Sequence, residues 1–516
     1  MDSLCGKLLT ATAILPFSAG NYRRRPNGCH YYDCIISSRV LILIFCALVI
    51  GFTISRGLPK HAEIRLVLTL GLLLVLLISA IAIFLFLGCQ VKRHGFESVV
   101  AAERKTNSWK LQVVFLWIFG LSSGLYCALF VGKQFECLNT GGGLYWNLLL
   151  IFNIVLIISV FGDIIFMSYF SPYKLKHRTS INNALTFLFG ANVTVILYVY
   201  LIGSTIQYFK ETTKNTLFKS CLEDNSTVTK IFNTLQHYLS PTFVEFTLMS
   251  CTILLDIWPT KQNAQSDSAS IPDINLNDET QPLLVNMTNP DHQNANNKTL
   301  CQMVTYAFSI AIGLGLIMCY AVLAFGVGDL EEMQYAAYIY ELTLKGLMIL
   351  AIFVGFFCLL HYCTPDDSSK GLKPADYVYL FSAFGVFMSH ICVAIGADET
   401  ADPTANIRFT NNIISFFHDY LQVVFLLYSN RCRKTTLRSH VHLLESVLIF
   451  IMISNFVLWF IDSFFLSEYP NTRQLPKNDF TKKLLGAVVD ILLPVSVFFR
   501  FTSFLEYYTT YEKFNP

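Results

Sequence analysis

The sequence predicts an all-α, polytopic membrane protein with twelve transmembrane helices in two halves of six. Twelve apolar stretches occur along the chain. Each has about 18 to 25 residues, enough for an α-helix to cross a hydrocarbon core of roughly 30 Å. A hydrophobic fraction of 54% with only 14% charged residues lies outside the range of ordinary soluble domains. One polar, Asn-rich segment separates the two sets of stretches.

Each predicted span ends where charged or polar residues interrupt an apolar stretch. In the first half the spans are Ser37–Ile54, Leu66–Leu87, Leu111–Val131, Trp146–Phe170, Ala184–Ile206 and Ile231–Trp258. In the second half they are Met303–Val327, Tyr338–His361, Asp376–Ile395, Asn411–Tyr428, Leu443–Leu466 and Leu484–Leu505. The predicted organisation is therefore an N-terminal segment (1–36), a first half (37–258), a linker (259–301), a second half (302–505) and a C-terminal tail (506–516).

Basic residues predict that both termini are cytosolic. Lys and Arg are enriched on the cytosolic side of membrane proteins, and three arginines, Arg23 to Arg25, precede the first span. This topology places the sequon at Asn225 in an extracellular loop, where we expect glycosylation. Cys137 and Cys221 also fall in extracellular loops, where a disulfide between them and two free thiols are alternatives. We expect the protein in the plasma membrane.

The polar segment predicts a flexible cytosolic linker. Residues Gln262 to Asn297 are rich in Asn, Asp, Gln and Ser and poor in aromatics, so they cannot bury enough apolar surface to order themselves. Six spans on either side suggest a direct repeat. Its best alignment pairs Pro241 with Pro494, each inside the last span of its half, and Phe246 with Phe499.

Strong local signatures of soluble enzymes are absent from the sequence. It contains no glycine-rich phosphate loop, no paired CxxC and no HExxH. Six of the 15 cysteines lie inside the predicted spans, where a thiol behaves as a small hydrophobe. We therefore expect no catalytic residue, no cofactor, no metal site and no nucleic-acid partner. Function must be sought in the polar side chains of the spans.

Glu245 in the sixth span is the first candidate. An ionisable group within a span costs several kcal/mol unless it faces water or a partner, which makes each one a candidate site. Glu245 follows Pro241 by four residues, and proline frees a backbone carbonyl and kinks a helix. Pro494 predicts a similar kink in the twelfth span. Glu245 is either a proton-carrying acid or a protonated acid hydrogen-bonded between helices.

Further candidates lie in the tenth and eleventh spans. His418 and Gln422 share one helix face, and Asp419 lies about 100° away. A histidine with a nearby carboxylate can relay protons, and a structural hydrogen bond between helices is the alternative. Asn455 and Asp462 are seven residues apart and share a face of the eleventh span. For Asp462, near the outer end, a solvated position is the alternative.

Other charged groups favour structural roles. Glu341 and Lys345 in the eighth span form an i, i+4 pair in the favourable order, and mutual neutralisation would let both enter the membrane. Arg500, near the inner end of the last span, is expected to reach the interface or to pair with a neighbour. Asp163 in the fourth span and His390 in the ninth are single groups, for which a structural role is favoured.

Five segments, in register along most of the chain, resemble the otopetrin proton channels. LQVVFLWIFGLSSGLY resembles the third helix of that family, and SPTFVEFTLMS resembles the sixth-helix segment around a V-E-[YF] core. LQVVFLLYSNRC, ISNFVLWFIDSF and ILLPVSVFFRFTSFLEYY resemble the tenth, eleventh and closing segments. The resemblance implies a homodimer of protomers with two six-helix barrels each, arranged with pseudo-fourfold symmetry around a central cavity that holds membrane lipid or sterol.

The resemblance also implies proton-selective conduction gated by pH. Family pathways use a buried Glu on the sixth helix, which Glu245 matches, with polar partners from the fourth and twelfth helices. Three positions depart from the family pattern: Asn153 replaces the usual Gln, Thr502 replaces the usual His, and His418 replaces the first Gln of Q-x-x-LQ. Because threonine cannot change charge, we expect conduction that is slower, differently gated by pH, or routed through His418.

The favoured function is a proton channel activated or modulated by extracellular acid. A twelve-helix secondary transporter has the same layout, but the loop after the second span lacks the G-x-x-x-D-R pattern of the largest carrier superfamily. A non-conducting membrane scaffold, whose polar residues only join helices, is a further alternative. The candidate pathway residues are Glu245, Asn153, His418, Asp419, Gln422, Asn455, Asp462, Thr502 and Arg500.

Overall fold

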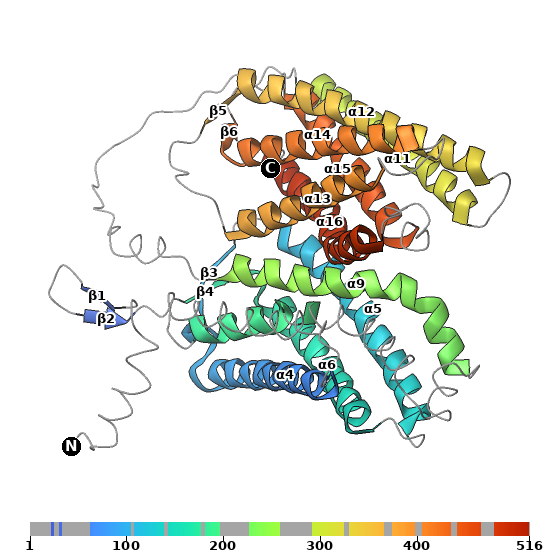
Figure 1. The fold of residues 1–516 in the computed structure, drawn as a ribbon. Coiled ribbons are helices and arrows are strands. Elements are labelled where there is room, and N and C mark those ends of the chain that lie inside the picture. Colours follow the sequence, from blue (N-terminus) through green and yellow to red (C-terminus); the bar gives the residue numbers. More distant parts are fainter. Residues whose placement is uncertain are drawn as a thin grey trace, which may run out of the picture. The chain divides into compact units, whose positions relative to one another are not determined.

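A computed structural model describes the greater part of the chain (Figure 1). The described residues are 22–24, 30–32, 62–104, 108–138, 143–176, 181–193, 195–196, 227–258, 291–324, 330–365, 374–397, 405–434, 441–465 and 479–514. Over these ranges the chain is helical apart from three pairs of short strands, one short 3-10 helix (Phe96–Ser98) and brief turns. This agrees with the predicted all-α class.

Contacts group the chain into two compact units, Met1–Pro259 and Thr260–Pro516. The helices of the first unit are α4 (Ala62–His94), α5 (Ser108–Glu136), α6 (Gly143–Phe170) and α9 (Thr227–Ile257), with further helical residues at 181–193 and 195–196. Those of the second unit are α11 (Asp291–Ala324), α12 (Leu330–Tyr362), α13 (Pro374–Ala397), α14 (Ala405–Ser429), α15 (Val441–Phe464) and α16 (Asp479–Phe514).

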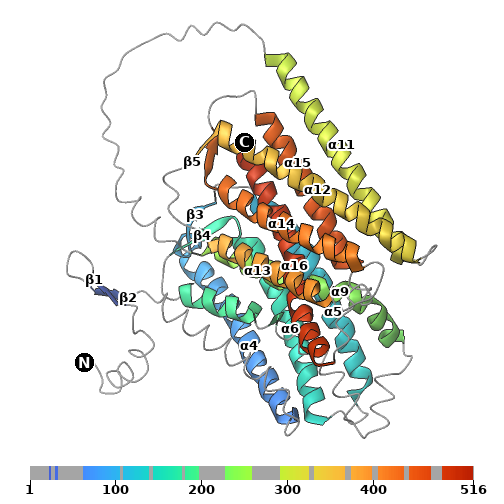
Figure 2. The ribbon, with the colours of Figure 1, turned by 45° about the horizontal axis from the view of Figure 1, so that its top comes forward.

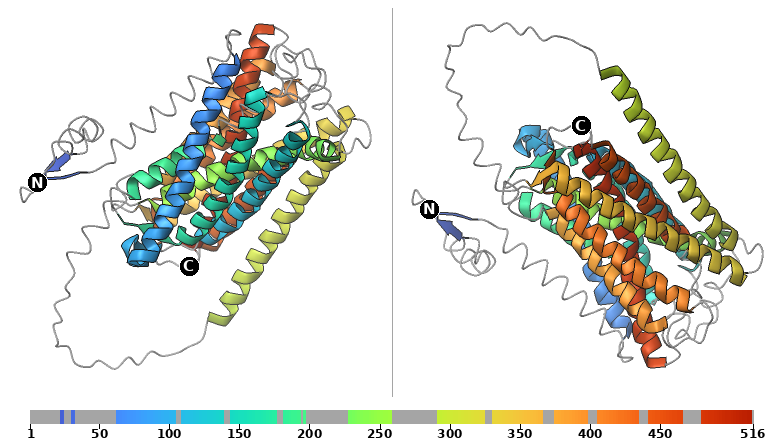
Figure 3. Two further views of the ribbon diagram at one scale, coloured as in Figure 1. Left: turned by 90° about the horizontal axis from the view of Figure 1, so that it is seen from below. Right: turned by 90° about the horizontal axis from the view of Figure 1, so that it is seen from above.

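Seven described helices are long and apolar enough to cross a membrane, namely α4, α5, α6, α9, α11, α12 and α15. The protein is therefore a polytopic membrane protein. α9 and α15 are buried along most of their apolar length, whereas α4 and α11 expose most of theirs. An apolar helix surface that no protein covers is the surface expected to face lipid. Figure 3 shows α11 at the outside of the second unit.

The ninth, tenth and twelfth predicted spans are also helices, seen as α13, α14 and α16, and they are not among those seven. In α14 the polar residues in the middle of the helix lower its mean hydropathy. Of the other predicted spans, Ser37–Ile54 lies outside the described residues. Ala184–Ile206 is helical at 184–193 and 195–196 and then leaves the described ranges.

The strands form three antiparallel pairs, which the sequence did not predict because each strand has only three or four residues. β1 (Tyr22–Arg24) pairs with β2 (His30–Tyr32) near the N-terminus. β3 (Val100–Glu103) follows α4 and pairs with β4 (Tyr173–Leu175), which follows α6. β5 (Cys363–Pro365) follows α12 and pairs with β6 (Cys432–Lys434), which follows α14. The second and third pairs thus join equivalent helix ends in the two units. Figure 2 shows α12 and α14 running alongside each other toward β5.

These strand pairs support the predicted direct repeat and set its register. When β4 is aligned with β6, Asn153 of α6 falls beside Asn412 of α14, and Phe166 falls beside Phe425. Buried and exposed side chains then follow nearly the same order along both helices. The order also matches between α9 and α16 from their prolines onward. Packing repeats too, because α5 contacts α6 and α9 as α13 contacts α14 and α16.

Two helices extend beyond their predicted ends. α11 begins at Asp291, inside the predicted linker, directly after Pro290. Residues 291–299 contain neither proline nor glycine, so nothing interrupts a helix that begins there. α16 continues to Phe514 through the predicted C-terminal tail. Lys513 anchors this extension, because its ammonium group donates to the carbonyl oxygens of Ser429 (3.1 Å) and Asn430 (3.0 Å).

Gly120 is the point at which three helices of the first unit converge. A Cβ atom added at Gly120 of α5 would lie 2.4 Å from Ile164 Cδ1 of α6 and 3.0 Å from Phe246 Cε2 of α9. At these distances the Ile164 side chain must shift, and the Phe246 ring leaves it little room to do so. The glycine therefore permits the close packing of α5, α6 and α9.

We expect Gly120→Ala to destabilise the protein by about 1–3 kcal/mol, because overpacking outweighs the better helix propensity of alanine. Thermal unfolding of detergent-purified protein would show a lower midpoint. Gly71 in α4 provides the matched control, since nothing lies within 4 Å of a Cβ atom added there. Equal midpoints for Gly120→Ala and Gly71→Ala would contradict the close approach.

Candidate functional site

A buried polar stripe runs along one face of α14. Asn411, Ser415, His418 and Gln422 follow one another at spacings of four, three and four residues, and each is at most 9% exposed. Helical geometry places such residues on one face, over a length of about 16 Å. This is roughly half of a hydrocarbon core. Buried polar groups in a span require partners, and α12, α13, α15 and α16 supply them.

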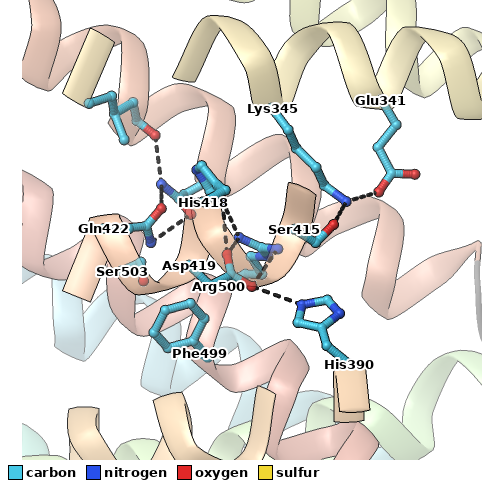
Figure 4. A network of polar contacts seen from close by, with 12 residues as sticks. Glu341, Lys345, His390, Ser415, His418, Asp419, Gln422, Phe499, Arg500 and Ser503 are labelled. Atoms are coloured by element: carbon cyan, nitrogen blue, oxygen red, sulfur yellow. Dashed lines mark hydrogen bonds and ion pairs between the residues drawn. The ribbon is translucent and has the colours of Figure 1, made fainter. Parts of the chain in front are cut away.

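Asp419 follows His418 in α14, about 100° around the helix from the stripe, and has three neighbouring side chains (Figure 4). The Arg500 guanidinium binds it in two places, with Nη1 at 2.5 Å from Oδ1 and Nη2 at 3.1 Å from Oδ2. His390 Nε2 lies 3.0 Å from Oδ2, and His418 Nδ1 lies 2.8 Å from Oδ1. The Asp419 side chain is fully buried. Helices α13, α14 and α16 therefore meet at one carboxylate.

His418 has one ring nitrogen engaged and one open. Nδ1 lies close to Asp419 Oδ1 and 3.3 Å from Arg500 Nη1, so it either donates to the carboxylate or accepts from the guanidinium. Nε2 is buried and has no hydrogen-bond partner among the described residues. When Nδ1 donates to the carboxylate, Nε2 is an acceptor without a donor. When Nδ1 accepts from the guanidinium, Nε2 carries a proton without an acceptor. Either state suits a group that exchanges protons with an entering water molecule.

An ion pair from α12 caps one end of the stripe. Lys345 binds Glu341, as the i, i+4 spacing predicted. Its ammonium group also donates to Ser415 Oγ (2.5 Å) and to Asn411 Oδ1 (3.3 Å) on α14. Tyr320 Oη donates to Glu341 Oε2 at 2.6 Å. The pair is thus neutralised, as expected, and it is also bonded directly to the stripe.

Gln422 and Asn455 join the other end of the stripe to α15. Their amides form two reciprocal hydrogen bonds, of 3.1 and 3.2 Å. Asn455 also donates to the carbonyl oxygen of Ile451 at 2.9 Å. Asp462, which shares a helix face with Asn455, is half-buried near the end of α15. These amides carry no net charge, so they can pass protons only through water or reorientation.

The structure gives the partners of three more residues of the second unit. Arg500 follows the second of its two expectations, because its side chain is 5% exposed and paired with Asp419. His390, predicted to be a single structural group, is bound to the same carboxylate and was missed as a site residue. Thr502 donates its hydroxyl to carbonyl oxygens of its own helix, at Phe498 or Phe499. No sequence signal relates His390 to Asp419, because they lie on different helices.

The first unit holds Glu245 and Asn153 in its interior. Glu245 of α9 is 1% exposed. One turn before it, the hydroxyls of Thr242 and Ser122 lie 2.7 Å apart and join α9 to α5. Asn153 of α6 donates to Gln134 Oε1 of α5 at 3.2 Å. The polar interior of this unit therefore also links three helices.

The remaining predicted features divide between described and undescribed residues. Pro241 lies within α9, which Figure 1 shows as a bent helix, and Pro494 lies within α16. Cys137 is disulfide-bonded. Its predicted partner Cys221 and the sequon at Asn225 lie outside the described residues, so that pairing and the glycosylation stay predictions. Among the described residues no group of three His, Cys, Asp or Glu side chains could hold a metal ion.

Comparison with known proteins identifies the family. A comparison with curated proteins found none that matches the chain. The otopetrin family profile matches residues 202–501, more than half of the chain. The matched region includes the segment around Glu245, the whole stripe of α14 and Arg500. The third-helix segment that resembles the family lies before it. With this match over both units, the chain belongs to the otopetrin family.

Proposed function

We propose that this protein is a proton channel that conducts H+ across the plasma membrane down its gradient and is activated or modulated by extracellular acid. Membership of the otopetrin family supports a channel. The observation that carries the proposal is the buried polar stripe of α14, with two histidines and one carboxylate in direct contact inside a membrane-spanning unit. Ionisable groups at such depth mark ion or proton paths.

The stripe offers a sequence of proton-exchanging groups. The Lys345–Glu341 pair and the Ser415 hydroxyl lie at one end, His418 and Asp419 lie in the middle, and amides lie at the other end. Imidazole changes charge near physiological pH, and its two nitrogens can receive a proton on one side and release it on the other. His418 has the open nitrogen that this step needs. Thr502, the replacement for the family His, cannot perform it.

Fixed cations beside the stripe favour protons over metal ions. Asp419 is held by Arg500 and Glu341 by Lys345. A sodium or potassium ion in a pore needs oxygen ligands in place of its hydration shell, and the carboxylates that would provide them are already occupied. A proton needs only one nitrogen or oxygen atom at a time. The pairing thus supports proton selectivity, with Arg500 as a barrier to other cations.

The other expectations complete the proposal. We place a second path in the first unit, with Glu245 as its acid and Asn153 as a polar neighbour. The protein forms a homodimer with lipid or sterol in a central cavity, and both termini are cytosolic. Asn225 is glycosylated and Cys221 pairs with Cys137, because this topology places all three residues in extracellular loops.

Whole-cell recording tests the proposed function. In cells that express the protein, external acid is expected to evoke an inward current that persists when sodium is removed. Its reversal potential should shift by about 59 mV per pH unit of gradient, the value for one charge per tenfold concentration ratio. Untransfected cells are the control. A reversal potential that follows sodium would contradict proton selectivity.

Two other outcomes would indicate the alternative functions. Substrate-dependent flux without free current would indicate a carrier, and reconstituted protein impermeable to protons at every pH would indicate a scaffold.

A further inference from the structure

Asp163 of α6 is a buried carboxylic acid that the proposed pathway does not yet use. It is 6% exposed, and its Oδ1 atom has no hydrogen-bond partner among the described residues. Its polar neighbour is the side chain of Asn192, which is itself buried. A satisfied structural acid would engage both oxygens. Asp163 instead presents one free oxygen in the interior of the unit.

The charge environment of Asp163 differs from that of the two carboxylates that are paired with cations in the second unit. Asp419 is bound by Arg500, and Glu341 is bound by Lys345. No ion pair joins Asp163 to a cation of the described residues. An unpaired carboxylate in a low-dielectric interior is costly. Such a group therefore stays protonated, and so neutral, until a neighbouring acceptor takes the proton.

The register of the repeat places Asp163 in a polar stripe of its own. With β4 aligned to β6, Ser159 of α6 takes the position of His418, and Asp163 takes the position of Gln422. Both α6 residues are buried, as are both residues of α14. The first unit therefore repeats the polar face of the second with different chemistry, and its titratable group lies one turn further along the helix.

Contacts at Gly120 place Asp163 at the depth of Glu245. Ile164 and Phe246 both approach Gly120, from α6 and α9 respectively, and each directly follows one of the two acids in sequence. At this depth the residue of α5 is Gly120, which has no side chain. The two carboxyl groups therefore belong to one layer of the unit.

The remaining charged groups on the helices that pack against α6 lie toward helix ends. Lys110, Lys133 and Glu136 lie near the ends of α5, and Lys92 and Arg93 lie at the end of α4. On α9, Lys230 and Asp256 lie near its two ends. At the layer of Gly120, Glu245 is thus the acid that accompanies Asp163.

We infer that Asp163 is a proton-binding residue of the first unit, where it exchanges the conducted proton in the layer of Glu245, at the position that Gln422 takes in the second unit. This inference rests on the proposed proton conduction. In this step one O–H bond breaks on the donor, which is water or the next acid, as another forms on the carboxyl oxygen of Asp163, and release reverses the transfer.

The test compares Asp163→Asn with Asp163→Glu in a His418→Gln background, so that the first unit carries the current. At equal surface expression, Asp163→Asn should reduce the acid-evoked current at least about tenfold. Asp163→Glu should retain most of it, because a carboxyl group remains. Glu97→Gln, the same kind of change at an exposed acid of the first unit, is the matched control and should conduct normally.

An infrared measurement gives a readout that does not depend on current. In purified protein a pH change should alter the carboxyl C=O band, and Asp163→Asn should remove part of that change. If Asp163→Asn does not reach the cell surface, the infrared comparison of purified Asp163→Glu with its parent carries the test, because the pH-dependent band differs between them only if residue 163 exchanges a proton. A conducting parent with an unaffected Asp163→Asn current would overturn the inference alone. A wild-type protein without any acid-evoked current would overturn the proposed function itself.

Discussion

Arg500→Gln is expected to cost about 3–5 kcal/mol of stability, because it leaves the buried Asp419 without its cation. Asp419 would keep only the two histidines, of which His390 is partly exposed and His418 is fully buried. Thermal unfolding of the detergent-purified protein, followed by size-exclusion chromatography, should show a large fall in the midpoint. The amount of protein at the cell surface should fall with it.

The double variant Asp419→Asn/Arg500→Gln provides the decisive comparison. It removes both charges and leaves no uncompensated ion, so it should be more stable than Arg500→Gln alone. Arg431→Gln, the same change at an exposed arginine, should leave the midpoint unaltered. A double variant less stable than the single one would show that the ion pair is not what holds α14 to α16.

Spacing within one helix predicted the part of the site that lies within one helix. The Glu341–Lys345 pair and the shared face of His418 and Gln422 follow directly from the helical period, and the structure contains both. Partners on other helices do not follow from it. Arg500 is 81 residues from Asp419, and only the packing of α13, α14 and α16 brings it and His390 to one carboxylate.

Apolar composition predicted the described spans as helices, and its signal is strongest where a helix is apolar along its whole length. α4 and α12 are long and apolar, and their existence follows from hydropathy. α14 is partly polar because its buried face carries the stripe, so the same feature that marks the site weakens the span signal. The strand pairs were beyond prediction, yet they supply the register that relates Asp163 to Gln422.

The double variant Glu245→Gln/His418→Gln is expected to lose the acid-evoked proton current. The current should fall at least about tenfold, because the barrier to conduction rises by about 1.4 kcal/mol or more in each unit. Each single variant should retain the current of the other unit, because Glu245 and His418 belong to different compact units. The measurement is whole-cell current at equal surface expression. Glu97→Gln/His94→Gln removes the same two kinds of group at exposed positions and should conduct normally.

The pattern of the single variants decides how the units cooperate. Two parallel paths predict that the losses in the single variants add up to the loss in the double variant. A single path through both groups predicts instead that either single variant already abolishes the current, as expected for residues that act as a unit. An undiminished current in the double variant would contradict both arrangements, because the buried acid and imidazole would then play no part in conduction. In that case the buried ionisable groups of α14 and α9 would serve only to join helices. The ion pair between Asp419 of α14 and Arg500 of α16 is a contact of that kind.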